Sequence, residues 1–127
     1  DKDTTMSVQL FKGREQRHFD RKQLYYYLKV LQTDTGRITG YLGDISSQGL
    51  MVFSKENIEP ETVMNLTIDL GKELDMAENL VFEAKSLWCE KDANPDYYAI
   101  GFMFIDFDQN SIDTVMYLTK KYGFAGH

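Results

Sequence analysis

Two short patterns in this sequence combine residue types that bind anions and purine bases. The first is Arg17-His18-Phe19-Asp20-Arg21, and the second is Asp44-Ile45-Ser46-Ser47-Gln48-Gly49. An arginine guanidinium is a planar fork of donors that matches a phosphate or the O6 and N7 edge of guanine. An ionised Asp accepts hydrogen bonds from guanine N–H groups, a Ser hydroxyl donates or accepts, and a Gly lets a ligand approach the backbone. Together the two patterns predict a site for an anionic guanine nucleotide.

The charge of the chain is divided unevenly. The sequence has 14 Lys and Arg against 20 Asp and Glu, a net charge of −6. The window 12–22, which contains Arg14, Arg17 and Arg21, carries +3 and leaves −9 for the other residues. An acidic body disfavours a general DNA or RNA surface, but a short basic segment still attracts a small anion. On charge alone a solvated N-terminal tail is the simpler interpretation, and it is the second pattern that favours ligand binding.

Hydrophobic periodicity predicts the elements that must position these residues. Alternating or short apolar segments predict strands over 24–31, 37–45, 50–53, 63–70, 80–90 and 97–106. Gly40 and Gly43, inside the second strand, predict bulges or a close approach of another backbone. A helical period follows Asp108, with Met116 on its apolar face and Gly123 suited to end it. The predicted fold class is mainly β, a six-stranded antiparallel barrel with a C-terminal α-helix.

The residue types needed for catalysis are scarce. The single cysteine, Cys89, excludes a disulfide framework and a four-cysteine zinc site, and its expected role is a buried structural thiol. The only histidines are His18 and the last residue, His127, which gives a catalytic triad weak support. Asp106 and Asp108 have the ligand chemistry for Mg²⁺, although such a pair more often stabilises the start of the next helix. We therefore expect no catalytic residue, no metal site and no enzymatic activity.

Two further absences bear on location. No apolar run approaches the length of about 18 residues that a membrane span needs. No charged segment followed by an apolar one suggests a secretion leader. We therefore expect a cytoplasmic protein without membrane insertion.

With both patterns in place, the sequence resembles the PilZ domains, a family that binds the bacterial second messenger cyclic di-GMP. The resemblance covers about residues 14–122. Either pattern alone would be common by chance, but here both occur in the correct order on a pattern of six strands and one helix. The residues that carry the resemblance are Arg17, Arg21, Asp44, Ser46 and Gly49. Weaker agreement comes from Pro60-Glu61-Thr62, Trp88 and Ile100-Gly101-Phe102-Met103-Phe104.

The resemblance implies a domain organisation and a ligand site. The PilZ-like domain would span 14–123, after a flexible lead-in at 1–13 and before a tail at 124–127. Cyclic di-GMP would be held between the Arg-rich segment 14–22 and the Asp-x-Ser-x-x-Gly turn. The implied ligand-binding residues are Arg17, Arg21, Asp44, Ser46 and Gly49, with Arg14 and His18 as further candidates.

Each of these residues has an implied role. Arg17 and Arg21 would contact phosphate and guanine, whereas the residues of the turn would line the base. Many family members have another Arg immediately before the first motif Arg, a feature associated with a stacked pair of ligands. Gln16 occupies that position here, so both one ligand and a stacked pair stay open. Arg14 would substitute for the missing Arg only in part.

The implied function is a non-enzymatic receptor or effector module in bacterial second-messenger signalling. It would need no cofactor beyond its ligand, and it would act on a downstream protein partner. The alternative is an adaptor that keeps the fold and works only through protein contacts, which the intact motifs argue against. A third reading, a barrel for single-stranded nucleic acid, is disfavoured by the acidic body, so we expect no DNA or RNA partner.

Overall fold

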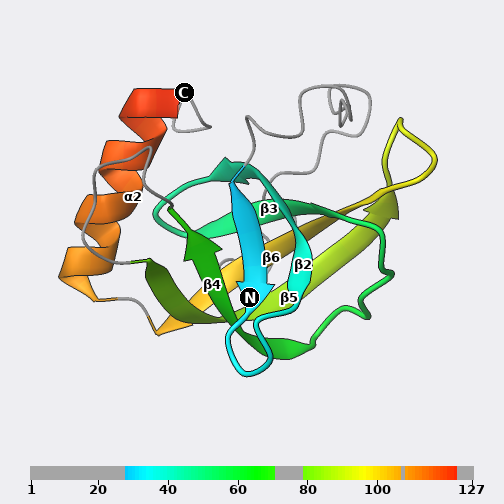
Figure 1. The fold of residues 1–127 in the computed structure, drawn as a ribbon, viewed down its shortest axis with the longest axis horizontal. Coiled ribbons are helices and arrows are strands. Elements are labelled where there is room, and N and C mark those ends of the chain that lie inside the picture. The colour runs from blue at the N-terminus through cyan, green and yellow to red at the C-terminus, as the bar shows by residue number, and fades with distance from the viewer. Residues whose placement is uncertain (1–27, 71–78, 107, 123–127) are drawn as a thin grey trace, which may run out of the picture.

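The described part of the chain forms a closed antiparallel barrel followed by a helix. The computed structural model describes residues 28–70, 79–106 and 108–122. Its elements are β1 (Lys29–Gln32), β2 (Ile38–Ile45), β3 (Gly49–Ser54), β4 (Val63–Asp69), β5 (Leu80–Lys91), β6 (Tyr98–Asp106) and α2 (Gln109–Tyr122). The strands close in the order β1-β2-β3-β6-β5-β4, and every pair is antiparallel (Figure 1). The predicted fold class is confirmed.

Turn chemistry fixes where the first two described strands reverse. Gly36 adopts a φ of 72°, a left-handed conformation that favours glycine, and its N–H donates to the Gln32 carbonyl at 2.8 Å. This hairpin aligns Val30 of β1 with Gly40 of β2. The predicted first strand began at Leu24, and residues 24–27 lie outside the described part of the chain.

Side chains on the strands alternate between the barrel interior and its outer face. The interior core contains Leu42, Val52 and Phe102, all with no exposed surface, and an edge-to-face contact between Phe82 and Phe104 at 5.0 Å between ring centroids. A second buried cluster, which we call the outer cluster, lies on the opposite face of the sheet. It comprises Met51, Phe53, Trp88, Tyr97 and Ala99, with Tyr41 and Leu87 packed against it.

Two glycines are required by close packing around the outer cluster. The pairing of β2 with β3 shifts register between Leu42 and Asp44, so Gly43 lies in a bulge. A Cβ atom at Gly43 would lie 2.5 Å from the Phe53 ring, and one at Gly101 would overlap the Trp88 indole. The prediction of a bulge or close approach at Gly43 is confirmed.

Helix α2 lies beside the barrel, on the side opposite the projecting β5–β6 hairpin (Figure 1). It begins with a side-chain cap, because the Ser111 N–H donates to Asp108 Oδ1 at 2.8 Å. Hydrogen bonds from Ser111 lower the pKa of the exposed Asp108 carboxyl. Asp108 thus does what the helix-start interpretation expected. Met116, which was predicted on the apolar face of the helix, is 56% exposed. The helical spacing of apolar residues did not show on which side of the helix the barrel lies.

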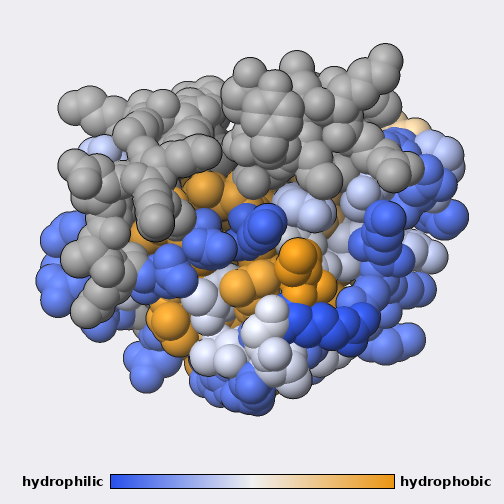
Figure 2. Space-filling view, in the orientation of Figure 1, coloured by the Kyte–Doolittle hydropathy of each residue, from blue (hydrophilic) through white to orange (hydrophobic). Residues whose placement is uncertain are grey.

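The described residues on one face of the molecule are mostly polar. On the face in Figure 2, hydrophilic residues predominate and smaller hydrophobic areas show near the centre. Exposed hydrophobic side chains such as Val63 and Val81 are ordinary for a folded domain. Within the described residues, no helix is long and apolar enough to cross a membrane.

Gly101→Ala should destabilise the domain, because its methyl group needs the space that the Trp88 indole fills. We expect a loss of about 1–3 kcal/mol in the free energy of unfolding, measured by urea denaturation. Combining it with Trp88→Leu should give less than the sum of the two single losses, because the smaller side chain leaves room for the methyl group. A Gly101→Ala protein as stable as the unmodified one would contradict the described packing.

Candidate nucleotide-binding site

The Asp-x-Ser-x-x-Gly pattern forms the tight turn between β2 and β3. The Ser46 N–H donates to the Gly49 carbonyl at 2.9 Å, which closes the turn. The Gln48 N–H donates to Ser46 Oγ at 3.1 Å, so the hydroxyl caps the turn from within. The Gln48 carbonyl accepts from the Phe104 N–H at 3.0 Å, which ties the turn to β6. The turn is therefore a rigid part of the barrel rim.

Asp44 is placed at this rim by the bulge at Gly43. The register shift aligns Asp44 with Met51, a member of the outer cluster. Its side chain is half-buried, and Oδ1 accepts a hydrogen bond from the Ile45 N–H at 3.0 Å. This backbone bond orients Asp44, and an ionised carboxylate has lone pairs for several donors. The carboxylate can therefore accept from a ligand N–H group beside an apolar surface.

Gly49 is buried and begins β3, where it pairs with Met103 of β6. Of the residues predicted for the ligand site, the structure thus brings together Asp44, Ser46 and Gly49 on one turn. The other four, Arg14, Arg17, His18 and Arg21, lie outside the described residues.

The outer cluster supplies an apolar surface next to the turn that the sequence reasoning missed. Met51 and Phe53 alternate with the interior residues of β3, and all six residues of that strand are buried. The continuous apolar run over residues 50–53 indicates burial on both faces of the strand, and this was the signal available in the sequence. Tyr97 was expected to be a core or sheet-face residue, and it is buried in this cluster. Such a surface suits the flat face of a purine base.

The candidates for catalysis have structural surroundings. The Cys89 thiol is half-buried and donates to Asn57 Oδ1 at 3.4 Å. Burial raises its pKa, which disfavours the nucleophilic thiolate at neutral pH. Within the described ranges, no group of three or more His, Cys, Asp or Glu side chains is arranged to hold a metal ion.

Comparison with known proteins places this fold and turn in a family. A family model of the PilZ domain matches residues 15–120. The chain belongs to the PilZ domain family. PilZ domains form a family of cyclic di-GMP receptors, and they are ligand-binding or adaptor modules.

A solved structure supports the same fold. The PilZ domain described here is similar to Bacillus subtilis Inhibitor of motility (MotI/DgrA), with a TM-score of 0.62 and 16% sequence identity. The match covers 88% of this chain and 56% of that protein, so the chain spans little more than half the length of MotI/DgrA. At this identity the likeness concerns the fold. No curated protein sequence matches this chain.

Ser46→Ala should loosen the turn, because it removes the hydroxyl that accepts from the Gln48 N–H. We expect a loss of about 1 kcal/mol in the free energy of unfolding, measured by urea denaturation. Ser47, the exposed neighbour, offers a matched control, and Ser47→Ala should change that free energy by less than about 0.5 kcal/mol. Equal effects of the two substitutions would contradict the cap assigned to Ser46.

Proposed function

We propose that this PilZ domain binds cyclic di-GMP between the Arg-rich segment 14–22 and the Asp-x-Ser-x-x-Gly turn, and passes the signal to a protein partner. The observation that carries the proposal is the placement of Asp44 on a rigid rim beside the outer cluster. A carboxylate next to an apolar surface offers a guanine both an acceptor for its N–H groups and a flat contact for its ring.

The Arg-rich segment 14–22 supplies the positive charge that the turn lacks. The ligand carries two phosphate charges, and the turn brings a carboxylate that would repel them. Arg17 and Arg21 provide paired donors for phosphate and for the guanine edge, with Arg14 as an additional cation and His18 as a ring to stack on a base. The +3 charge of residues 12–22 offsets the ligand charge, while the −9 elsewhere repels longer polyanions. Selectivity for a small dianion follows from this division.

Binding becomes a signal when it changes a surface that a partner contacts. A ligand shifts a conformational equilibrium only by its different affinity for the two states. Arg17 and Arg21 belong to the segment that leads into the barrel. If they contact the ligand in one conformation of that segment and not in another, the two states differ in their affinity for the ligand. The proposed partner is a downstream protein, and the domain acts as a receptor without a cofactor of its own.

A second candidate function is that of an adaptor that works without nucleotide. The structurally similar protein is named an inhibitor of motility, and such a role is compatible with action through protein contacts. In an adaptor of this kind, the Asp-x-Ser-x-x-Gly turn would be a structural part of the barrel and would bind no ligand. The two candidates predict opposite results in a nucleotide titration.

Isothermal titration calorimetry with cyclic di-GMP tests the proposal. The unmodified protein should bind, and Arg17→Ala and Arg21→Ala should each weaken binding about tenfold or more, as expected from about 1–3 kcal/mol per bidentate contact. Asp44→Ala should weaken binding as well. Lys91→Ala is the charge control, because Lys91 lies at the β5–β6 hairpin, over the Tyr98 ring, and should leave the affinity within about twofold.

Two results would count against the receptor. Absence of both heat and thermal stabilisation at millimolar ligand would support the adaptor instead. An equal loss in Lys91→Ala and in the two arginine variants would show that net charge, rather than the paired arginines, determines binding.

A further inference from the structure

Strand β5 is longer than the strand that pairs with it on one side, and part of its edge is therefore open. Pairing with β4 ends at Lys85. The turn before β4 covers the next position, because the Ser86 N–H donates to the Thr62 carbonyl at 2.9 Å and the Ser86 carbonyl accepts from the Glu61 N–H at 2.7 Å. Over residues 87–91, β6 is the one described strand that pairs with β5 (Figure 1). We call residues 87–91 the open β5 edge.

The hydrogen-bond pattern shows which backbone groups face this edge. The Asp92 N–H donates to the Tyr97 carbonyl at 2.9 Å across the hairpin, and the pairing over 88–91 runs without a shift. Hydrogen-bonded and non-hydrogen-bonded pairs alternate along an antiparallel ladder. Every second residue therefore bonds to β6, whereas Cys89 and Lys91 direct their N–H and carbonyl groups away from it. No described residue hydrogen-bonds to these outward backbone groups.

The contacts that Cys89 and Lys91 do make involve their side chains. Cys89 packs against the interior core, and its thiol donates to Asn57 Oδ1 at 3.4 Å. The Lys91 ammonium lies 5.5 Å from the centroid of the Tyr98 ring. Side chains stand out of the plane in which strands hydrogen-bond, so these contacts leave the outward backbone groups available. An available edge is a template for another strand.

The open β5 edge has acidic surroundings. Lys85 pairs with Glu61 at 3.2 Å, so their charges offset each other. Burial raises the pKa of the Cys89 thiol, and the charges of Glu90 and Glu59 raise it further, so both carboxylates lie near this side chain. Two lysines and five carboxylates belong to the turn before β4, the end of β5 and the hairpin: Lys85, Lys91, Glu59, Glu61, Glu90, Asp92 and Asp96.

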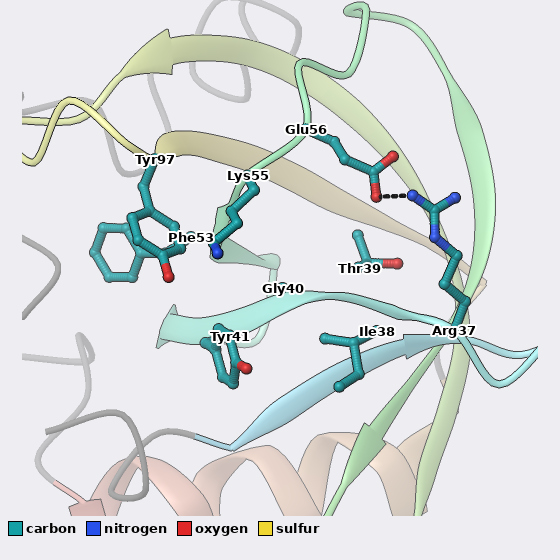
Figure 3. Close-up of a pocket in the computed structure, with 9 residues that line it drawn as sticks. All are labelled: Arg37, Ile38, Thr39, Gly40, Tyr41, Phe53, Lys55, Glu56 and Tyr97. Carbon is teal, nitrogen blue, oxygen red and sulfur yellow. Dashed lines mark hydrogen bonds and ion pairs between the residues drawn. The ribbon is translucent and has the colours of Figure 1, made fainter. Parts of the chain in front are cut away.

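Two other cations do not offset this charge. Lys55 follows β3, which lies on the opposite side of β6 from the open edge, and its ammonium lies 5.8 Å from the centroid of the Tyr97 ring (Figure 3). Arg37 pairs with Glu56 at 2.6 Å, as the same figure shows. The negative charge at the open edge therefore favours a basic strand.

The same charge disfavours a second copy of this chain. The two-fold register that uses both outward residues pairs Cys89 of one copy with Lys91 of the other. It sets the two Glu90 side chains opposite each other, and like charges in that position are destabilising. A strand with Lys or Arg opposite Glu90 is stabilised by the same geometry.

We propose that the open β5 edge is the docking site of a protein partner, which adds an extended basic segment as a further strand. Backbone groups of that segment bond to Cys89 and Lys91, and one of its Lys or Arg side chains lies opposite Glu90. The proposal rests on action through a protein partner, which the receptor and the adaptor share, and it does not depend on nucleotide binding.

Amide hydrogen exchange of the full chain, followed by NMR without cyclic di-GMP, tests first whether the edge is open. The Cys89 and Lys91 amides should exchange at least about tenfold faster than those of Trp88 and Glu90, which face β6.

The probe for docking is a short capped peptide that alternates Lys with Val, the Lys peptide. At about ten times its dissociation constant it should slow exchange at Cys89 and Lys91 about tenfold. One control peptide has Pro in place of the central Val, which faces an outward residue when Lys faces Glu90. The other control, the Glu peptide, has Glu in place of each Lys. Both controls should bind at least about fivefold more weakly.

Three variants separate backbone pairing from charge. Lys91→Pro removes an outward N–H and no bond to β6, and should weaken binding of the Lys peptide about five- to tenfold. Lys91→Gln, its matched control, keeps that N–H and should bind the Lys peptide at least as tightly. Glu90→Lys should reverse the preference, so that the Glu peptide binds more tightly than the Lys peptide. Thermal unfolding shows which variants are folded, and Glu90→Lys decides the matter if Lys91→Pro does not fold.

The proposal is overturned if the Cys89 and Lys91 amides of the free chain exchange as slowly as their neighbours, because the edge is then already covered. It is also overturned if the three peptides bind equally, or if Glu90→Lys leaves the preference unchanged. Because cyclic di-GMP is absent from these measurements, failure here leaves nucleotide binding to its own calorimetric test.

Discussion

Between Leu42 and Asp44 the pairing of β2 with β3 slips by one residue, and the arrangement of the site depends on that slip. In a regular strand, Asp44 and Leu42 would share a face, and Leu42 is fully buried inside the barrel. The bulge at Gly43 instead brings the carboxylate to the rim, opposite Met51 of the outer cluster. Only glycine fits at position 43, because a Cβ atom there would lie 2.5 Å from the Phe53 ring. One backbone irregularity thus couples the packing of the outer cluster to the chemistry of the turn.

Strand β3 is buried on both of its faces, and the two faces have different roles. The inner face holds the fold together through the core around Val52 and Phe102. The outer face carries the outer cluster, whose apolar surface lies beside the Asp44 turn. The net charge of −9 outside residues 12–22 disfavours the binding of long polyanions. Small anions with flat rings are the ligands that such a face suits.

The sequence predicted what depends on local pattern. Period-two alternation located the strands, and Gly43 marked the bulge, because both signals lie within a few neighbouring residues. Asp44, Ser46 and Gly49 were predicted for the site and lie together on one turn. The outer cluster could not be found in this way, because it depends on long-range pairings such as Met51 with Gly101.

The most direct test of the receptor is a map of amide chemical shifts in a ¹H–¹⁵N spectrum as cyclic di-GMP is added. The account predicts that the largest changes fall at the turn amides from Asp44 to Gly49 and at the Trp88 indole N–H, which lies in the adjacent outer cluster. Amides of helix α2 beyond its first turn should change less. A spectrum unchanged at saturating ligand, or changes confined to α2, would contradict the assignment of the turn as the ligand site.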